Sequence, residues 1–149
     1  MYPEDVAVIT TVSSFCFIFT CINTYMKLAL TVGIGSFIGG MLRYLISMWI
    51  HERVVVKFPL GTLLVNIIGC LLIGMVFEYF SKSNADRQWL LFATTGILGG
   101  FTTFSAFSFE TVTMVREGQL TTALGYILAS VVIGLAATYG GIVLARSLG

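Results

Sequence analysis

Long apolar stretches separated by short polar turns run along most of this chain. Four of them, residues 28–50, 60–80, 89–114 and 120–144, are each near the roughly 20 residues that a helix needs to cross a bilayer. Charged and turn-forming residues gather between them, in "HERVVVKFP", "SKSNADR" and "REGQ". Because these turns are short, consecutive spans are predicted to run antiparallel.

The first 25 residues form one more apolar stretch. Its core, "VAVITTVSSFCFIFTCI" (6–22), lacks the basic start and the small-residue cleavage site of a signal peptide. Met26 followed by Lys27 opens the next span as a natural N-terminus would. We therefore expect residues 1–25 to be an apolar extension left by an over-extended start, and residues 26–149 to be the four-span domain. The alternative is a fifth span.

Composition favours an integral membrane protein. The chain has 149 residues, of which 57% are hydrophobic and 10% are charged. So few charged residues cannot cover the core of a soluble domain of this length with a polar shell. A formal net charge of +1 gives no reason to expect a nucleic-acid partner. The sequence contains neither HExxH nor GxSxG, so we expect no enzyme.

The basic residues divide evenly between the two ends of the spans. Lys27, Lys82, Arg87 and Arg146 fall on one side, and Arg53, Lys57, Arg116 and, within the first span, Arg43 fall toward the other. An even division removes the bias that normally sets orientation in the membrane. This pattern predicts insertion in both orientations and pairing of opposite copies. The alternative is that the loops are simply short and the bias is weak.

The segment "GILGGFTTFSAFSFET" (96–111) predicts an interrupted third helix. Gly99 and Gly100 are followed by Thr102 and Thr103, and glycines before β-branched residues form helix poorly. Interrupted backbone is tolerated in a bilayer only where it is buried in protein or lines a cavity. The carbonyl groups that such a break frees can hold a cation.

Beyond the predicted break, aromatic and hydroxyl side chains share one helical face. Phe104, Phe107, Ser108 and Thr111 are spaced by three, four and seven residues. Ring edges carry positive potential and hydroxyl hydrogens donate, so this face suits a small anion that accepts hydrogen bonds. The alternative is ordinary packing between helices.

The remaining polar and aromatic residues of the spans have structural alternatives. Asn66 in the second span offers amide donors but could equally bond two helices together. Tyr126, Ser130 and Thr138 form a polar stripe on the fourth span, although such hydroxyls also bond back to their own helix. We expect Phe101 and Phe109 to pack between helices, and Glu110 to lie near the end of the third span.

Three blocks together resemble the fluoride channels of the Fluc (CrcB) family: "GIGSFIGGMLRYL" (33–45), "GTLLVNIIGCLLIG" (61–74) and "TGILGGFTTFSAFSFE" (95–110). The third block is the most specific, and the resemblance covers about residues 26–147. It implies an all-α integral membrane protein with four transmembrane helices per subunit, a broken third helix and a dual-topology antiparallel homodimer. Residues 26–149 would then be a four-span fluoride channel domain in the bacterial plasma (inner) membrane.

The resemblance also implies roles for individual residues. The fluoride pathway would contain Asn66, Thr103, Phe104, Ser105, Phe107, Ser108, Tyr126, Ser130 and Thr138. Arg43 would lie near an aqueous vestibule, and the backbone carbonyls of Gly99 and Thr102 would hold a structural sodium ion at the dimer interface. Gly134 departs from the pattern, because a serine is common there.

The implied function is passive export of cytoplasmic fluoride, which lowers fluoride toxicity. One alternative is a small dual-topology multidrug exporter, but that class needs a carboxylate in the first span and residues 28–50 contain none. Another is a non-transporting membrane interaction protein built on the GxxxG faces Gly35–Gly39 and Gly96–Gly100.

Overall fold

The computed structural model describes residues 3–54, 58–83 and 86–148, with side chains from residue 22 onward. The elements are α1 (Pro3–Arg53), α2 (Leu60–Lys82), α3 (Arg87–Leu91), the π-helical η1 (Phe92–Leu98), α4 (Gly99–Phe101), α5 (Phe104–Arg116) and α6 (Leu120–Leu148). Four helical stretches are long and apolar enough to cross a membrane: Ile22–Arg53, Leu60–Lys82, Arg87–Arg116 and Leu120–Leu148. The prediction of four spans in an all-helical, multi-pass membrane protein is confirmed.

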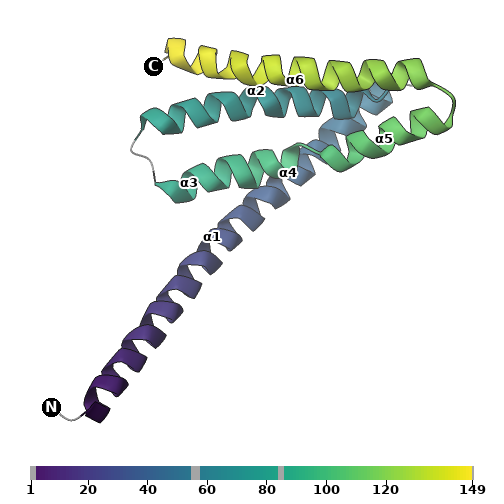
Figure 1. Ribbon diagram of the computed structural model, residues 1–149. Helices are drawn as coiled ribbons and strands as arrows, with labels where there is room; N and C mark the ends of the chain where they lie inside the picture. The colour runs from purple at the N-terminus through teal and green to yellow at the C-terminus, as the bar shows by residue number, and fades with distance from the viewer. Residues whose placement is uncertain (1–2, 55–57, 84–85, 149) are drawn as a thin grey trace.

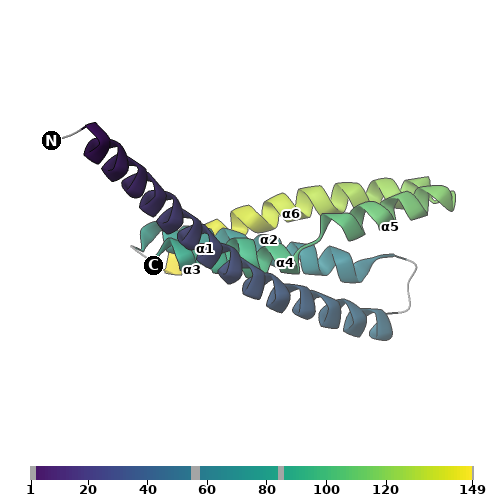
Figure 2. The same cartoon turned by 90° about the horizontal axis from the view of Figure 1, so that it is seen from below.

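Helix α1 crosses the other helices diagonally, and its N-terminal half leads away from them (Figures 1 and 2). The helix is continuous from Pro3 to Arg53, so residues 3–25 prolong the first span without an intervening turn. Their status as an extension stays a prediction. Lys57, which the charge pattern included, lies outside the described residues.

Helices α2 and α6 run parallel to each other and lie in close contact along most of their length (Figure 1). A Cβ atom at Gly74 would overlap the carbonyl oxygen of Thr138, and one at Gly141 would overlap that of Leu71. Small residues allow backbones to approach in this way where lipid gives no hydrophobic drive for association.

The two GxxxG motifs pack against each other within the chain. A Cβ atom at Gly96 would lie 3.1 Å from the Cα of Gly35, and one at Gly39 would overlap the carbonyl oxygen of Ile97. Gly100 is equally close to the backbone of α1. These faces therefore join the first span to the third, and they are not free for the intermolecular contacts of the membrane interaction protein considered above.

The third span is broken within the predicted segment of glycines and threonines. Thr102 (φ −82°, ψ 153°) and Thr103 (φ −145°, ψ 118°) are extended, whereas Gly99 is helical with φ −65° and ψ −36°. The break therefore lies at the two threonines of that segment. β-Branched residues favour extended backbone, while Gly96 and Gly100 allow the close contact with α1.

Candidate functional site

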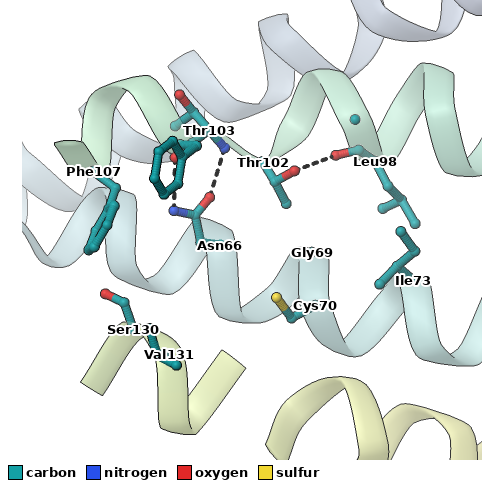
Figure 3. Close-up of a pocket in the computed structure, with 12 residues that line it drawn as sticks. Asn66, Gly69, Cys70, Ile73, Leu98, Thr102, Thr103, Phe107, Ser130 and Val131 are labelled. Atoms are coloured by element: carbon teal, nitrogen blue, oxygen red, sulfur yellow. Dashed lines mark hydrogen bonds between the residues drawn. The ribbon is translucent and has the colours of Figure 1, made fainter. Parts of the chain in front are cut away.

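The side-chain amide of Asn66 holds the break in place. Its Oδ1 accepts a hydrogen bond of 2.8 Å from the Thr103 N–H, and its Nδ2 donates to the Thr103 carbonyl over 3.1 Å (Figure 3). Peptide groups that leave a helix at membrane depth need such partners. Asn66 therefore bonds two helices together, and since its amide has two N–H groups, the second stays available as a donor.

Helix α5 begins at Thr103, which caps it. The Thr103 hydroxyl oxygen accepts from the Ala106 N–H at 3.3 Å and lies 3.2 Å from the Ser105 hydroxyl oxygen. A threonine at the N-cap satisfies one of the donors that every helix start leaves unpaired. The chain thus re-enters helical conformation immediately after the break.

Because two backbone N–H groups at the break donate to side-chain oxygens, two backbone carbonyl groups lose the donors that they would have in a continuous helix. In a continuous helix the Thr103 N–H would bond to the Gly99 carbonyl, and the Ala106 N–H to the Thr102 carbonyl. Here both N–H groups donate to side-chain oxygens instead. The carbonyls of Gly99 and Thr102 are therefore released from helical bonding.

Arg43 lies against the same segment. Its Nε donates to the Gly100 carbonyl at 3.4 Å, and the Ser36 hydroxyl donates to the Gly96 carbonyl over the same distance. The resemblance implied a vestibule for Arg43, and the structure places its guanidinium on the backbone of α4. Helix α1 thus supports the third span through two side chains as well as through its glycines.

A cavity of about 340 Å³ lies beside the break, between α2, α5 and α6. We call it the break cavity; its walls include Asn66, Gly99, Thr102, Thr103, Phe104, Phe107 and Ser130 (Figure 3). The rings of Phe104 and Phe107 have centroids 5.6 Å apart. Phe104 is 79% exposed, so the break cavity opens at the surface of the chain.

The Ser130 hydroxyl is buried in a wall of the break cavity and points toward Phe107 (Figure 3). Within the described residues it has no hydrogen-bond partner. Leaving a buried hydroxyl unpaired costs about 1–3 kcal/mol, so a hydroxyl in this position suits a ligand that accepts a hydrogen bond.

Glu110 lies toward the end of the third span (Arg87–Arg116), as expected, and its carboxylate is bonded to two neighbouring helices. The Thr62 hydroxyl donates to one of its carboxylate oxygens at 2.6 Å, and the Tyr126 hydroxyl donates to the other at 2.7 Å. Sequence reasoning named Glu110 but missed its two partners. The available signal was a carboxylate inside an apolar span, which needs donors from facing helices.

The bond to Glu110 occupies the hydrogen of Tyr126. A tyrosine hydroxyl has one hydrogen to donate, so in this arrangement Tyr126 has none for an anion. Its buried ring packs against Phe107, with centroids 5.1 Å apart, and supports that side chain.

The other predicted pathway residues are distributed more widely. Thr138 donates to the Gly134 carbonyl at 3.1 Å, as in the back-bonding alternative, and is not among the residues that line the break cavity. Ser105 is exposed and Ser108 is half-buried on α5, and neither lines that cavity.

The two phenylalanines expected to pack between helices differ. Phe101 is 5% exposed, which confirms the prediction. Phe109 is 74% exposed, so its predicted packing is wrong for the single chain. It projects from the outer surface of α5.

A second cavity, of about 490 Å³, leads inward from the end of the bundle where α1 ends and α2 begins. We call it the loop cavity; its lining includes His51, Phe58, Thr62 and Glu110. Glu110 and Tyr126 therefore lie between the loop cavity and the Phe107 wall of the break cavity.

Comparison with known proteins identifies similar sequences. Residues 30–142 match the family described as CrcB-like protein, Camphor Resistance (CrcB). The chain is 41% identical over 124 residues to the "Fluoride-specific ion channel FluC" of Rhizobium meliloti (strain 1021), covering 83% of this chain and 99% of that protein. It is 43% identical to the protein of that name from Flavobacterium psychrophilum over 124 residues, 83% and 100% of the two chains. The Clostridium perfringens protein of that name is 50% identical over 98 residues, 64% and 76% of the two chains.

Proposed function

We infer, because this chain belongs to the CrcB-like family of multi-pass bacterial membrane proteins, that it is a fluoride-specific channel through which fluoride leaves the cytoplasm passively. Hydrogen fluoride is a neutral weak acid that crosses lipid and dissociates inside the cell, where the charge traps the anion. An inside-negative potential of 100 mV contributes about 2.3 kcal/mol per charge toward export. A selective open path is therefore enough to lower fluoride toxicity.

The break cavity is the observation that carries this proposal. It brings together the free N–H of Asn66, the rings of Phe104 and Phe107, and the unpaired hydroxyl of Ser130. All of these groups are neutral, and they offer hydrogens or ring edges to an acceptor. Such a site can solvate a small anion without a fixed positive charge that would hold it too strongly.

Of the remaining pathway residues, Thr103 lines this cavity and the others lie outside its walls. Thr103 and Ser105 hold the break, Tyr126 supports Phe107 from behind, and Ser108 and Thr138 extend the polar track along their helices. Glu110 must keep its two donors while an anion passes, because a buried carboxylate without hydrogen-bond partners is costly.

A second copy of the chain completes the site. The break cavity opens at the surface beside Phe104, and the released carbonyl of Gly99 lies on the same exposed side. Polar backbone exposed to lipid at membrane depth costs several kcal/mol per group. Covering by an oppositely inserted copy, consistent with the even division of basic residues, gives the antiparallel homodimer.

The carbonyls of Gly99 and Thr102 fit a structural sodium ion at that interface. Both are released from helical bonding by Asn66 and Thr103. Two such oxygens from each subunit would provide oxygen ligands of the kind that hard cations bind. The ion would offset the repulsion between anions in the two subunits, while membrane lipid covers the outer faces.

Efflux from liposomes tests the function. Purified protein is expected to release fluoride far faster than chloride or a cationic drug. Phe107→Ile, which removes the ring edge, should abolish most of the flux while the dimer persists on size exclusion. Phe77→Ile, which changes an exposed ring on α2, is the matched control. Unchanged fluoride flux in Phe107→Ile would contradict the assigned pathway, and equal chloride flux would contradict the function.

A further inference from the structure

A third cavity lies far along the chain from the fluoride site, where α2 and α6 end. It has a volume of about 510 Å³, which is within the range of small-molecule sites. We call it the terminal groove; its walls include Met75, Tyr79, Phe80, Ala145 and Leu148, with Lys82 at its rim. None of these residues takes part in the fluoride pathway.

Among the described residues that line the terminal groove, Lys82 is the basic one. Arg146 donates to Glu78 at 3.0 Å, so the neighbouring carboxylate is already neutralised. Lys82 is exposed and forms no ion pair within the described part of the chain. The Ser83 hydroxyl donates to the Phe80 carbonyl and so has no hydrogen for a ligand. Lys82 is therefore the group that a ligand's charge would meet.

The position of the groove in the membrane identifies the ligand. Lys82 is the last residue of α2 and Leu148 the last of α6, so the rim lies where these two spans leave the hydrocarbon region. Exposed Tyr79 and Trp89 lie at the same end, and such aromatic residues are typical of the headgroup level. An apolar floor below this level and an ammonium group at it match an acyl chain and a phosphate.

The geometry points to a binding site for one anionic phospholipid, with an acyl chain in the terminal groove and the headgroup phosphate on Lys82. Anionic lipid is favoured over zwitterionic lipid because the surroundings are basic. Lys27 and Arg87 lie at this end of the spans in addition to Lys82 and outnumber the acidic Asp86, while Arg146 is paired with Glu78. The Gln88 amide donates to the Thr31 hydroxyl and places the start of α3 beside that part of α1. A positive surface attracts anionic headgroups.

Native mass spectrometry of the full chain, released from bilayers of equal phosphatidylglycerol and phosphatidylcholine, tests this site. The wild type should retain phosphatidylglycerol preferentially. Lys82→Gln should lower that preference about fivefold, since one basic residue near a membrane surface contributes about 1 kcal/mol. Arg87→Gln is the matched control, because it removes a charge at the same end but does not line the groove. Equal losses in the two variants would overturn the proposal.

A second variant tests the groove itself. Ala145→Trp fills the apolar floor and should abolish retention of both phosphatidylglycerol and phosphatidylcholine. Its fluoride efflux, measured in parallel, should persist and so report a folded channel. Lipid retained by Ala145→Trp would overturn the site. Displacement of phosphatidylglycerol by millimolar inorganic phosphate would assign the rim to a free anion and contradict the proposal. A change of oligomeric state in Ala145→Trp would assign the groove to a second copy and would also contradict it.

Discussion

Ser130 and Tyr126 lie one turn apart on α6, yet their hydroxyl groups have different partners. Tyr126 donates to Glu110, whereas Ser130 is buried without a partner in the part of the chain that the structure describes. Both fitted the polar stripe equally well in the sequence. The difference depends on Glu110, which one residue can reach and the other cannot. Which of the two hydroxyl groups can donate to an anion therefore depends on whether its hydrogen is already donated to another residue.

Ser130→Ala separates a ligand role from a structural one. Removing one donor to the anion should reduce fluoride efflux about tenfold, which corresponds to roughly 1–1.5 kcal/mol. The free energy of unfolding should stay the same or rise, because an unpaired buried hydroxyl is lost. Efflux and detergent unfolding would be measured on the same preparations.

The control for this variant is Ser147→Ala, whose exposed hydroxyl donates to the Leu144 carbonyl near the end of α6. It should leave efflux unchanged. A loss of stability in Ser130→Ala together with full efflux would show a packing role and contradict the ligand assignment.

At the scale of elements, the third span depends on its neighbours for its shape. Helix α2 holds the break through Asn66, and α1 holds η1 and α4 through glycine contacts, Ser36 and Arg43. The Thr102 N–H still donates to the Leu98 carbonyl, whereas the N–H and the carbonyl of Thr103 bond only to the side chain of Asn66 among the described residues. The break is therefore a feature that three helices maintain together.

Asn66→Ala should destabilise the protein by several kcal/mol. It leaves the N–H and the carbonyl of Thr103 without partners, at about 1–3 kcal/mol for each buried group. Asn66→Asp keeps an acceptor for the N–H, so its stability should be intermediate, but its negative charge beside the break cavity should abolish fluoride flux. An alanine variant as stable as wild type in detergent unfolding would refute the role of this side chain at the break.

Gly39→Ala tests the contact between α1 and the third span. The added methyl group would overlap the Ile97 carbonyl, and overpacking of this kind costs about 1–3 kcal/mol or more. Gly33→Ala is the matched control, because its Cβ would have no atom within 4 Å. We expect a lowered melting temperature and lowered efflux for Gly39→Ala only; the same decrease in both variants would point to a general loss of glycine flexibility.

A feature of this fold can be predicted from the sequence when it depends on residues close together in the chain, and not when it depends on contacts between distant helices. The spans follow from hydropathy because bilayer thickness fixes their length, and the broken third helix follows from local residue preferences. The exact position of the break does not, since Gly96 and Gly100 on either side of Gly99 pack closely against α1 in the helical conformation. The partners of Glu110 also escape prediction, because Thr62 and Tyr126 reach it only through the rotation of two other helices.

At the scale of the whole molecule, a single chain leaves one side of the break cavity exposed at its surface. Phe104 and Phe109 on α5 are exposed. The break cavity opens beside Phe104, and exposed Gly99, whose carbonyl is released from helical bonding, also lines that cavity. The phenylalanine rings suit lipid tails, but the polar carbonyl and the polar wall of the cavity are unfavourable there. The even division of basic residues allows a partner of opposite orientation to cover this side.

Added charge should separate the two orientations. Ser147→Arg with Leu148→Arg adds positive charge at one end, and Leu120→Arg with Thr121→Arg adds it at the other, all at exposed positions. Each double variant alone should orient one way and lose most fluoride efflux from cells, because the positive-inside bias then acts. Coexpression of the two should restore efflux. Full activity of either one alone would contradict the antiparallel pair.

The opening of the break cavity at the chain surface also has a consequence for gene dosage. If working pores form only where two oppositely inserted copies meet, then at low expression their number rises with the square of the amount of protein made. Halving synthesis would remove about three quarters of the export capacity. A cell would then gain fluoride resistance steeply over a narrow range of expression.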